Sequence, residues 1–324
     1  MTPPRDARSV AAELRQLVVD GSLDIPDPGS GRTLERWAAL ALLGCRDLTL
    51  ARLGEGHLDA VSILHQAGRT EVPNALYGVW AARSGGTGAV LNDNKLSGTV
   101  RFCSGAHGLD RALVAALTPA GESVLLDVDL LDPRILRQTG TWQAVGMDAS
   151  DSPDVVFADL PVTDEDRVGD PGFYLDRPGF WWGGGGVAAV WYGGARGLVD
   201  RTTEYLRSGK GPDEHQLAHL GDLEATLAAT ASLLQATARL IDDSPSTNVM
   251  QEIWVLRAAV ERVVRATVDQ VPRITGPTPL SRDRDFAQAL ADLQVYVRQH
   301  HAERDLAALG RLISEGKDVT WPPR

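Results

Sequence analysis

Two short stretches of this sequence carry side chains that can do chemistry, and the first is Cys103-Ser104-Gly105-Ala106. It follows a run in which aromatic and β-branched residues alternate with small polar ones, a pattern that predicts a strand. A hydroxyl and backbone amides at the end of a strand can bind a flat polar ligand. A strand end of this composition can also be only a turn, so the motif alone leaves both interpretations open.

The second stretch lies near the C-terminus, after a helix pattern whose apolar residues recur every three or four positions: Phe286, Leu290, Leu293 and Val297. Steps of three and four residues from Val297 reach His300 and His301, so one imidazole is expected to face the interior of the helices. Glu303 and Asp305 follow at once. An inward histidine is either a catalytic group or a hydrogen-bonded core residue.

A weaker candidate is the group Glu55, His57 and Asp59, which lies at the expected start of a helix near residues 59–66. An acid and a histidine at a helix start can contact a ligand, and they can equally be a capped and solvated first turn. Two other motifs give weaker evidence of a binding site. The glycines at 183–186 lack the framing of a phosphate-binding loop, and His215 and His219 lack the carboxylate expected of a zinc site.

The elements that must position these residues fall into three regions. Residues 1–75 predict short amphipathic helices, one of them beginning near Thr33. Residues 76–170 contain short apolar runs separated by turns, including a strand pair around Asn92-Asp93-Asn94, and predict an antiparallel β domain. Residues 171–324 carry long apolar stripes with steps of three and four, which predict an antiparallel four-helix bundle.

Composition narrows the function classes. The chain has 32 basic and 43 acidic residues among its 324, and no block of Lys or Arg, which disfavours binding to nucleic acid or to an anionic membrane. Cys45 and Cys103 are far apart and match no metal or redox spacing, which indicates free thiols in a reducing compartment. The sequence shows no signal peptide and no long apolar run, so we expect a soluble cytoplasmic protein.

The order of these pieces resembles the acyl-CoA dehydrogenase superfamily: helices, a β domain containing G-x-x-x-F-C-S-G-A, then a four-helix bundle with a polar cluster on its last helix. The stretch LPVTDEDRVGDPGFYLDRPGFWWGGGGVAAVWYGGARGL is similar to the segment that joins the family's β domain to its bundle. QVPRITGPTPLSRDRDFAQALADLQVYVRQHHAERDLAALG is similar to its closing helices. The fold class implied is α+β, mainly α.

The resemblance implies a flavoprotein that holds FAD. The family's residues at the flavin ring align with a predicted strand and with the Cys103-Ser104-Gly105-Ala106 motif. The positions are Tyr77, Val79 and Trp80 in the strand, and Phe102, Ser104 and Gly105 at the motif. Its pyrophosphate arginine and its residues near the adenine match three positions in the helical region: Arg207, Gln270 and Gly276. An aromatic ring can pack against the flavin, and hydroxyl or amide groups can bond its polar edge.

The resemblance departs from the family at the catalytic base. Members remove a proton next to a thioester carbonyl with a Glu about two helical turns beyond an Arg-Asp pair. Counting from Ala291-Asp292, that position is His300, with Glu303 one turn further on, so His300 and Glu303 are the candidate catalytic residues. The family's acidic Thr-Glu-Pro and Gly-Ser-Asp pattern is also missing.

Three functions follow from the resemblance. The first is α,β-dehydrogenation of an acyl thioester. Acyl-CoA is then the candidate substrate, and a separate electron acceptor is the partner. The second is a flavin-dependent monooxygenase that works with a separate reductase. The third is a non-catalytic paralogue that serves as a partner subunit. The family's shared adenine site also implies a homodimer or homotetramer, and no metal is expected.

Overall fold

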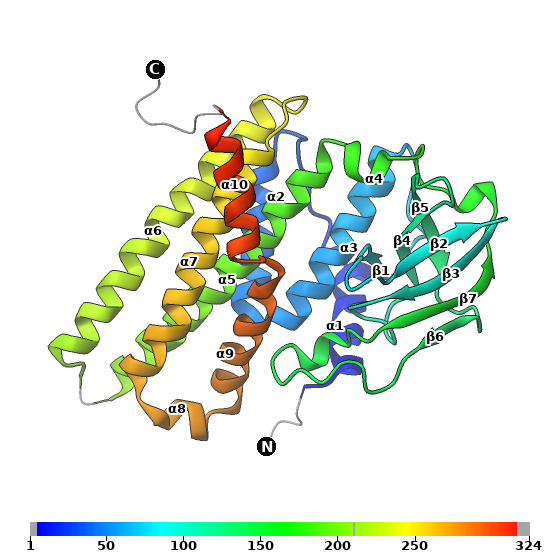
Figure 1. Ribbon diagram of the computed structural model, residues 1–324. Helices are drawn as coiled ribbons and strands as arrows, with labels where there is room; N and C mark the ends of the chain where they lie inside the picture. Colours follow the sequence, from blue (N-terminus) through cyan, green and yellow to red (C-terminus); the bar gives the residue numbers. More distant parts are fainter. Residues whose placement is uncertain (1–4, 210, 316–324) are drawn as a thin grey trace. The chain divides into compact units, whose positions relative to one another are not determined.

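The computed structural model describes residues 5–209 and 211–315, and their contacts form two compact units (Figure 1). Unit 1 consists of Met1–Pro28 and Asp47–Phe180, and unit 2 consists of Gly29–Arg46 and Trp181–Arg324. The regions 1–75, 76–170 and 171–324 expected from the sequence follow the order of helices and strands along the chain. The units follow contacts instead, because the helix at 33–46 groups with the C-terminal helices.

Unit 1 is built on a seven-stranded sheet in the order β1-β4-β2-β3-β7-β6, with β5 paired to β4. The strands are β1 (Tyr77–Trp80), β2 (Gly88–Asn92), β3 (Lys95–Val100), β4 (Arg111–Leu117), β5 (Ser123–Asp129), β6 (Ile135–Arg137) and β7 (Val155–Pro161). Most neighbours are antiparallel, as expected, whereas β1 and β2 both run parallel to β4. Alternation of apolar residues does not encode strand direction, so the parallel pairs were not predictable from it.

The β2–β3 hairpin confirms the turn expected at Asn92-Asp93-Asn94. Asn92 pairs with Lys95, and the two residues between them, Asp93 and Asn94, have φ of 48° and 55°. Two consecutive residues with positive φ form the turn type that suits the twist of a two-residue hairpin, and Asp and Asn tolerate this conformation.

Three α-helices accompany the sheet in unit 1: α1 (Ala7–Val19), α3 (Leu48–Gln66) and α4 (Phe173–Asp176), with 3-10 turns η1 (Asp148–Ser150) and η2 (Asp164–Asp166). Helix α3 packs against β1. It begins far earlier than the expected 59–66, because the Asp47 side chain accepts the Leu50 N–H at 2.6 Å and caps the helix there. Glu55 and His57 therefore lie in the middle of a helix, not in its first turn.

Unit 2 is helical. Its elements are α2 (Thr33–Arg46), α5 (Gly179–Ser208, whose first two residues belong to unit 1), α6 (Glu214–Asp243), α7 (Met250–Thr275), α8 (Pro277–Arg282), α9 (Arg284–Tyr296), η3 (Val297–Gln299) and α10 (Glu303–Ser314). The expected apolar stripes are buried in α7, in α9 and at the start of η3, at Ile253, Leu256, Val260, Val263, Phe286, Leu290, Leu293 and Val297. The predicted C-terminal bundle is confirmed, with α2 as an additional helix that packs on α6.

Glycines let α2 approach α5 closely. A Cβ atom at Gly44 would lie 2.3 Å from the Val190 carbonyl oxygen, and one at Gly193 would lie 2.0 Å from the Ala41 oxygen. Distances this short exclude any side chain, so the two helices pack backbone to backbone. Among the described residues, none of the helices is both long enough and apolar enough to cross a membrane.

Candidate functional site

In unit 1 the loop that follows β3 carries Ser104, and backbone hydrogen bonds join it to the loop before β7. Cys103 N–H donates to the Pro153 oxygen (3.0 Å) and Gly105 N–H to the Ser150 oxygen (2.8 Å). The amide of Gly105, which the sequence suggested for ligand binding, is therefore used within the protein. These bonds fix the backbone on both sides of Ser104.

The Ser104 hydroxyl ends a short chain of buried hydroxyl groups. Ser152 Oγ donates to Ser104 Oγ at 2.9 Å, and Ser150 Oγ lies 2.8 Å from Ser152 Oγ. A hydroxyl has one proton to donate and two lone pairs to accept with. Because Ser104 accepts from Ser152, its own proton is available to a further acceptor.

Two aromatic side chains flank Ser104. Trp80 is buried, and its Nε1–H donates to the Ser104 carbonyl oxygen at 3.2 Å. Phe102 is 48% exposed, the Arg101 guanidinium lies 4.9 Å from its ring centroid, and its φ of 60° is rare for a bulky residue. Such backbone conformations cluster at functional sites, where the surrounding structure holds them in place.

The remaining flavin-ring candidates have packing roles in the structure. Tyr77 is fully buried in a core cluster, and its hydroxyl accepts the Val72 N–H at 3.1 Å. Val79 packs against the same cluster. At Gly105, with φ of 75°, a Cβ would lie 2.7 Å from Cγ of Leu109, so only glycine fits there. Of the six candidates, Ser104 and Phe102 remain the ones able to present a polar group or a ring to a ligand.

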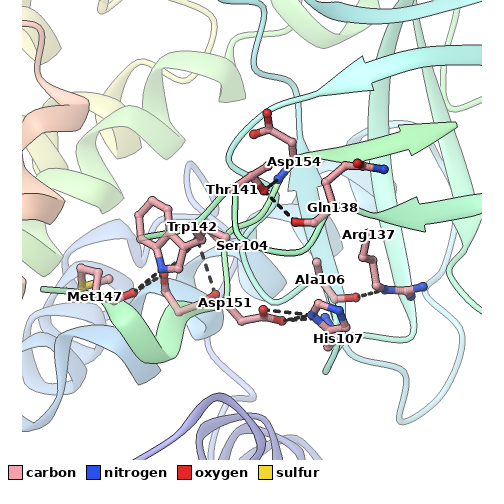
Figure 2. Close-up of polar contacts among 12 residues, drawn as sticks. Ser104, Ala106, His107, Arg137, Gln138, Thr141, Trp142, Met147, Asp151 and Asp154 are labelled. Atoms are coloured by element: carbon pink, nitrogen blue, oxygen red, sulfur yellow. Dashed lines mark hydrogen bonds and ion pairs between the residues drawn. The ribbon is translucent and has the colours of Figure 1, made fainter. Parts of the chain in front are cut away.

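Figure 2 shows a second polar group beside this loop. His107 Nδ1 lies 3.0 Å from both Asp151 carboxylate oxygens, and His107 N–H donates to Asp151 Oδ2 at 2.7 Å. Arg137 Nε donates to the Ala106 carbonyl oxygen at 2.6 Å. The loop that holds Ser104 is thus anchored by side chains as well as by backbone.

Also in unit 1, Glu55 is buried in the middle of α3, 3% exposed, and forms an ion pair with Arg52 at 2.7 Å. Burial raises the pKa of Glu55 to about 7; the charge of Arg52 opposes this shift and the neighbouring Asp59 adds to it. The solvated first turn considered for this stretch is therefore wrong. A carboxyl with a pKa in this range can exchange a proton near neutral pH.

In unit 2, His300 lies in the turn between η3 and α10. It is 3% exposed, whereas His301 is exposed, which confirms that one imidazole of the pair faces inward. Burial lowers the pKa of His300, against the charge of Asp305. Glu303, the other candidate base, is exposed in the first turn of α10.

Arg207 lies in the last turn of α5 and lines a cavity of about 940 Å³ between α5 and α6. Three acids line the same cavity: Asp200, Glu204 and Glu224. Arg196 binds two of them, Asp200 at 2.7 Å and Glu224 at 2.5 Å. Arg207 has no ion pair among the described residues, so its charge is the one available to an anion.

Gln270 and Gly276 lie toward the C-terminal end of α7. Gln270 Nε2 donates to Asp222 of α6 at 2.7 Å, and its Oε1 is buried without a hydrogen bond in the described part of the chain. Gly276 ends α7 with φ of 64°. Arg207 and Gln270 thus both adjoin the stretch of α6 around Gly221 and Asp222, although Gln270 does not line the cavity.

Several residues of these sites were not predicted from the sequence. Ser150 and Ser152 complete the hydroxyl chain, and Arg52 supplies the partner of Glu55. A signal was present for the serines, which alternate with acids in Asp148-Ala-Ser-Asp-Ser. For Arg52 the signal was its i,i+3 spacing from Glu55. This spacing predicts an ion pair only when both residues lie in one helix, and α3 begins at Leu48.

Among comparisons with known proteins, a match to a family model covers the C-terminal region. A family model described as the acyl-CoA dehydrogenase C-terminal domain matches residues 170–297. No curated protein gives a significant match to the whole sequence.

Solved structures of similar fold cover nearly all of the chain. TdsC from Paenibacillus sp. A11-2, a dibenzothiophene monooxygenase solved with FMN and indole, has a TM-score of 0.76 at 18% identity, covering 95% of this chain and 96% of its own. KijD3 with FMN and a dTDP-linked amino-keto sugar gives 0.82 at 18%, covering 96% and 91%. Nitrososynthase from Micromonospora carbonacea var. africana gives 0.75 at 16%, covering 97% and 98%.

These findings agree with the order of elements inferred from the sequence. The chain therefore has the acyl-CoA dehydrogenase-like fold, and its residues 170–297 match the family model of the acyl-CoA dehydrogenase C-terminal domain.

Proposed function

We propose that this chain is a flavin-dependent oxidoreductase that oxygenates a small molecule. The observation that carries this choice is His300. A buried imidazole occupies the position at which the resemblance places the dehydrogenase carboxylate, while Glu303 is exposed. Proton removal next to a thioester suits a carboxyl whose pKa is raised in an apolar pocket, and Glu303 is not in such a place. A buried imidazole suits hydrogen bonding to a substrate or to oxygen.

The residues around Ser104 fit the polar edge and the face of a flavin. Ser104 has a free proton to donate, and the exposed ring of Phe102 is a surface on which a flat heterocycle can pack. When bound, the reduced cofactor would supply the two electrons by which one atom of O₂ enters the substrate and the other leaves as water. A separate reductase would provide those electrons.

The solved structures of similar fold support a flavin and leave FMN and FAD as the two forms to be distinguished. TdsC and KijD3 were solved with FMN. The family resemblance favours FAD, whose adenine end would use Gln270 and Gly276, with Arg207 at the pyrophosphate. FMN has no adenine, so a chain that takes FMN would need the arginine and not the other two.

The second candidate function is α,β-dehydrogenation of an acyl thioester. The match of residues 170–297 to the acyl-CoA dehydrogenase C-terminal domain favours it. In that reaction a base would take the Cα proton, and a flavin, when bound, would supply the acceptor for the Cβ hydrogen and its two electrons.

Two steps test the proposal. The near-ultraviolet and visible spectrum of the purified protein is recorded, and any cofactor released on denaturation is identified by mass. The flavin is then reduced without oxygen, either by acyl-CoA or by an external reductase. We expect bleaching with the reductase only. Bleaching by acyl-CoA would instead establish the dehydrogenase.

Variants link the spectrum to the site. Ser104→Ala should weaken retention of the flavin, whereas Ser97→Ala should not, because the Ser97 hydroxyl on β3 donates to Asp159 at the protein surface. A colourless protein that takes up neither FMN nor FAD would contradict both enzyme functions and favour the non-catalytic partner subunit.

A further inference from the structure

The turn that carries His300 is held against α7 on the N-terminal side of the histidine. Arg298 forms an ion pair with Glu261 of α7 at 2.9 Å. Arg257 of the same helix donates to the Gln299 carbonyl oxygen at 3.4 Å. Because the two residues that precede His300 are bonded to one helix, the imidazole has a fixed point of attachment.

The backbone also determines which ring nitrogen of His300 is protonated. The Ala302 N–H donates to His300 Nδ1 at 3.2 Å. A backbone N–H can only donate, so Nδ1 must be without a proton. In a neutral imidazole the proton then lies on Nε2, and within unit 2 the described residues provide no hydrogen-bond partner for Nε2.

Ala302 adopts an unfavourable backbone conformation in order to make this bond. Its φ is 42° and its ψ is −113°, outside the regions that a residue with a Cβ normally occupies. The next turn secures it, because His301 N–H donates to Asp305 Oδ2 at 3.0 Å and Leu306 N–H donates to the Ala302 oxygen at 3.0 Å. Strain that neighbouring bonds maintain at a candidate site is consistent with a functional role.

The charges around His300 agree with a neutral ring. Burial is the largest influence and lowers its pKa; Arg257 and Arg298 act in the same direction, while Asp305 and Glu261 act against it. Protonation of Nδ1 would also place two N–H donors against each other, one on the ring and one on Ala302.

We propose that the Ala302 amide locks His300 in the Nε2–H tautomer, so that His300 donates a hydrogen bond to an electron-rich oxygen or ring nitrogen of the substrate. The substrate contact rests on the function proposed above. A neutral ring in this state has no free lone pair on nitrogen, so it cannot take a proton from a substrate carbon. His300 would then bind and orient an acceptor group, and it would not replace the dehydrogenase carboxylate.

Nitrogen NMR tests the tautomer without reference to activity. Protein labelled with ¹⁵N-histidine is compared with the His300→Gln variant to assign the ring signals, and long-range ¹H–¹⁵N couplings identify the protonated nitrogen. We expect an unprotonated Nδ1 and a protonated Nε2 at neutral pH. A protonated Nδ1, or an average over both tautomers, would overturn the proposal.

Two amide substitutions test the donor role. Glutamine can place its NH₂ group near the position of Nε2, whereas asparagine reaches only the position of Nδ1. We expect His300→Gln to keep kcat within about 10-fold of the parent and His300→Asn to lose about 100-fold. His215→Gln, at an exposed histidine in α6, serves as the control.

The outcomes distinguish the tautomer of His300 from its proposed hydrogen bond to the substrate. Equal losses in His300→Gln and His300→Asn would overturn the donor role. Full activity in both variants, together with an Nε2–H signal in the parent, would refute the place of His300 in the proposed function while leaving its tautomer established.

Discussion

Each unit buries a titratable side chain, and burial shifts the two in opposite directions. In unit 1 it raises the pKa of Glu55 to about 7, because the carboxylate loses hydration. In unit 2 it lowers the pKa of His300, because the imidazolium loses hydration. Both groups are therefore driven towards their neutral forms. Burial disfavours the charged form whichever sign the charge has, so the stabilities of the two units should depend on pH with opposite signs.

The largest expected effect distinguishes the role of His300 from that of its neighbour. If His300 contacts the substrate, His300→Ala should lower kcat by about 100- to 1,000-fold, the usual value of a positioned catalytic group. Glu303→Gln should change kcat by less than about 3-fold, because Glu303 is exposed. Steady-state kinetics measure both. A loss confined to Glu303→Gln would reverse the assignment.

Next in size is the cost of breaking the buried pair in unit 1. Glu55→Ala should lower the free energy of unfolding by about 3 kcal/mol at a pH above the pKa of Glu55, because one member of a buried ion pair is removed. Arg32 and Glu35 provide the control, with the same i,i+3 spacing and the same 2.7 Å distance in an exposed pair. Glu35→Ala should cost at most about 0.5 kcal/mol in urea denaturation. Equal costs would contradict the difference in burial.

The pH dependence of stability should show the sign predicted for Glu55. Its ordinary pKa is 4.5 and its folded value is about 7, so the stabilisation is present below pH 4.5 and is lost as the pH rises to about 7. The loss should be about 3 kcal/mol, because each pKa unit corresponds to about 1.4 kcal/mol. The midpoint temperature of thermal unfolding should fall less steeply with rising pH for Glu55→Gln than for the parent. Glutamine keeps the size of the side chain and does not titrate. Parallel curves would show that Glu55 titrates normally.

His300 should show the opposite sign. Its folded pKa lies below the ordinary 6.5, so its stabilisation is present above pH 6.5 and is lost as the pH falls towards the folded value. His300→Gln should remove this acid-side loss and leave the Glu55 effect unchanged. The change in the pH dependence of the free energy of unfolding should be smaller than the change caused by Glu55→Gln. A difference between parent and His300→Gln that does not vary with pH would contradict this prediction.

The smallest effect concerns the backbone at Ala302. Ala302→Gly should raise the free energy of unfolding by about 0.5–1 kcal/mol, because glycine adopts positive φ without steric cost. Ala307→Gly, at an exposed position in the interior of α10, should lower it by about 1 kcal/mol through helix propensity. Opposite signs in urea denaturation support the strained turn, and a loss in both variants would contradict it.

Sequence patterns predicted the parts of the fold that depend on local chemistry. The hairpin turn at Asp93 and Asn94 and the apolar stripes of α7 and α9 follow from turn residues and helical spacing. The start of α3 could not be predicted in the same way, because Gly54 and Gly56 weaken the helix signal that the Asp47 cap and tertiary packing restore. The burial of Glu55 depends on that start and was missed with it.

The site was predictable in part for a similar reason. The inward position of His300 follows from the spacing after Val297, even though the helix ends at Tyr296. The amide of Ala302 and its backbone conformation could not be inferred, because residue type does not indicate a positive φ at an alanine. The order of helices and strands, which gave the family resemblance, carried more information than any single motif.

The close packing of α2 on α5 has a consequence for how the chain folds. Helix α2 is made early in synthesis, yet its glycine contacts at Gly44 and its packing on α6 require segments made much later. Until those segments emerge, the apolar side of α2 is uncovered and prone to aggregate. The long sequence separation of these contacts predicts slow assembly of unit 2. This long separation also means that no single cut separates the two units, because a fragment that ends at residue 180 keeps α2 without the helices on which it packs.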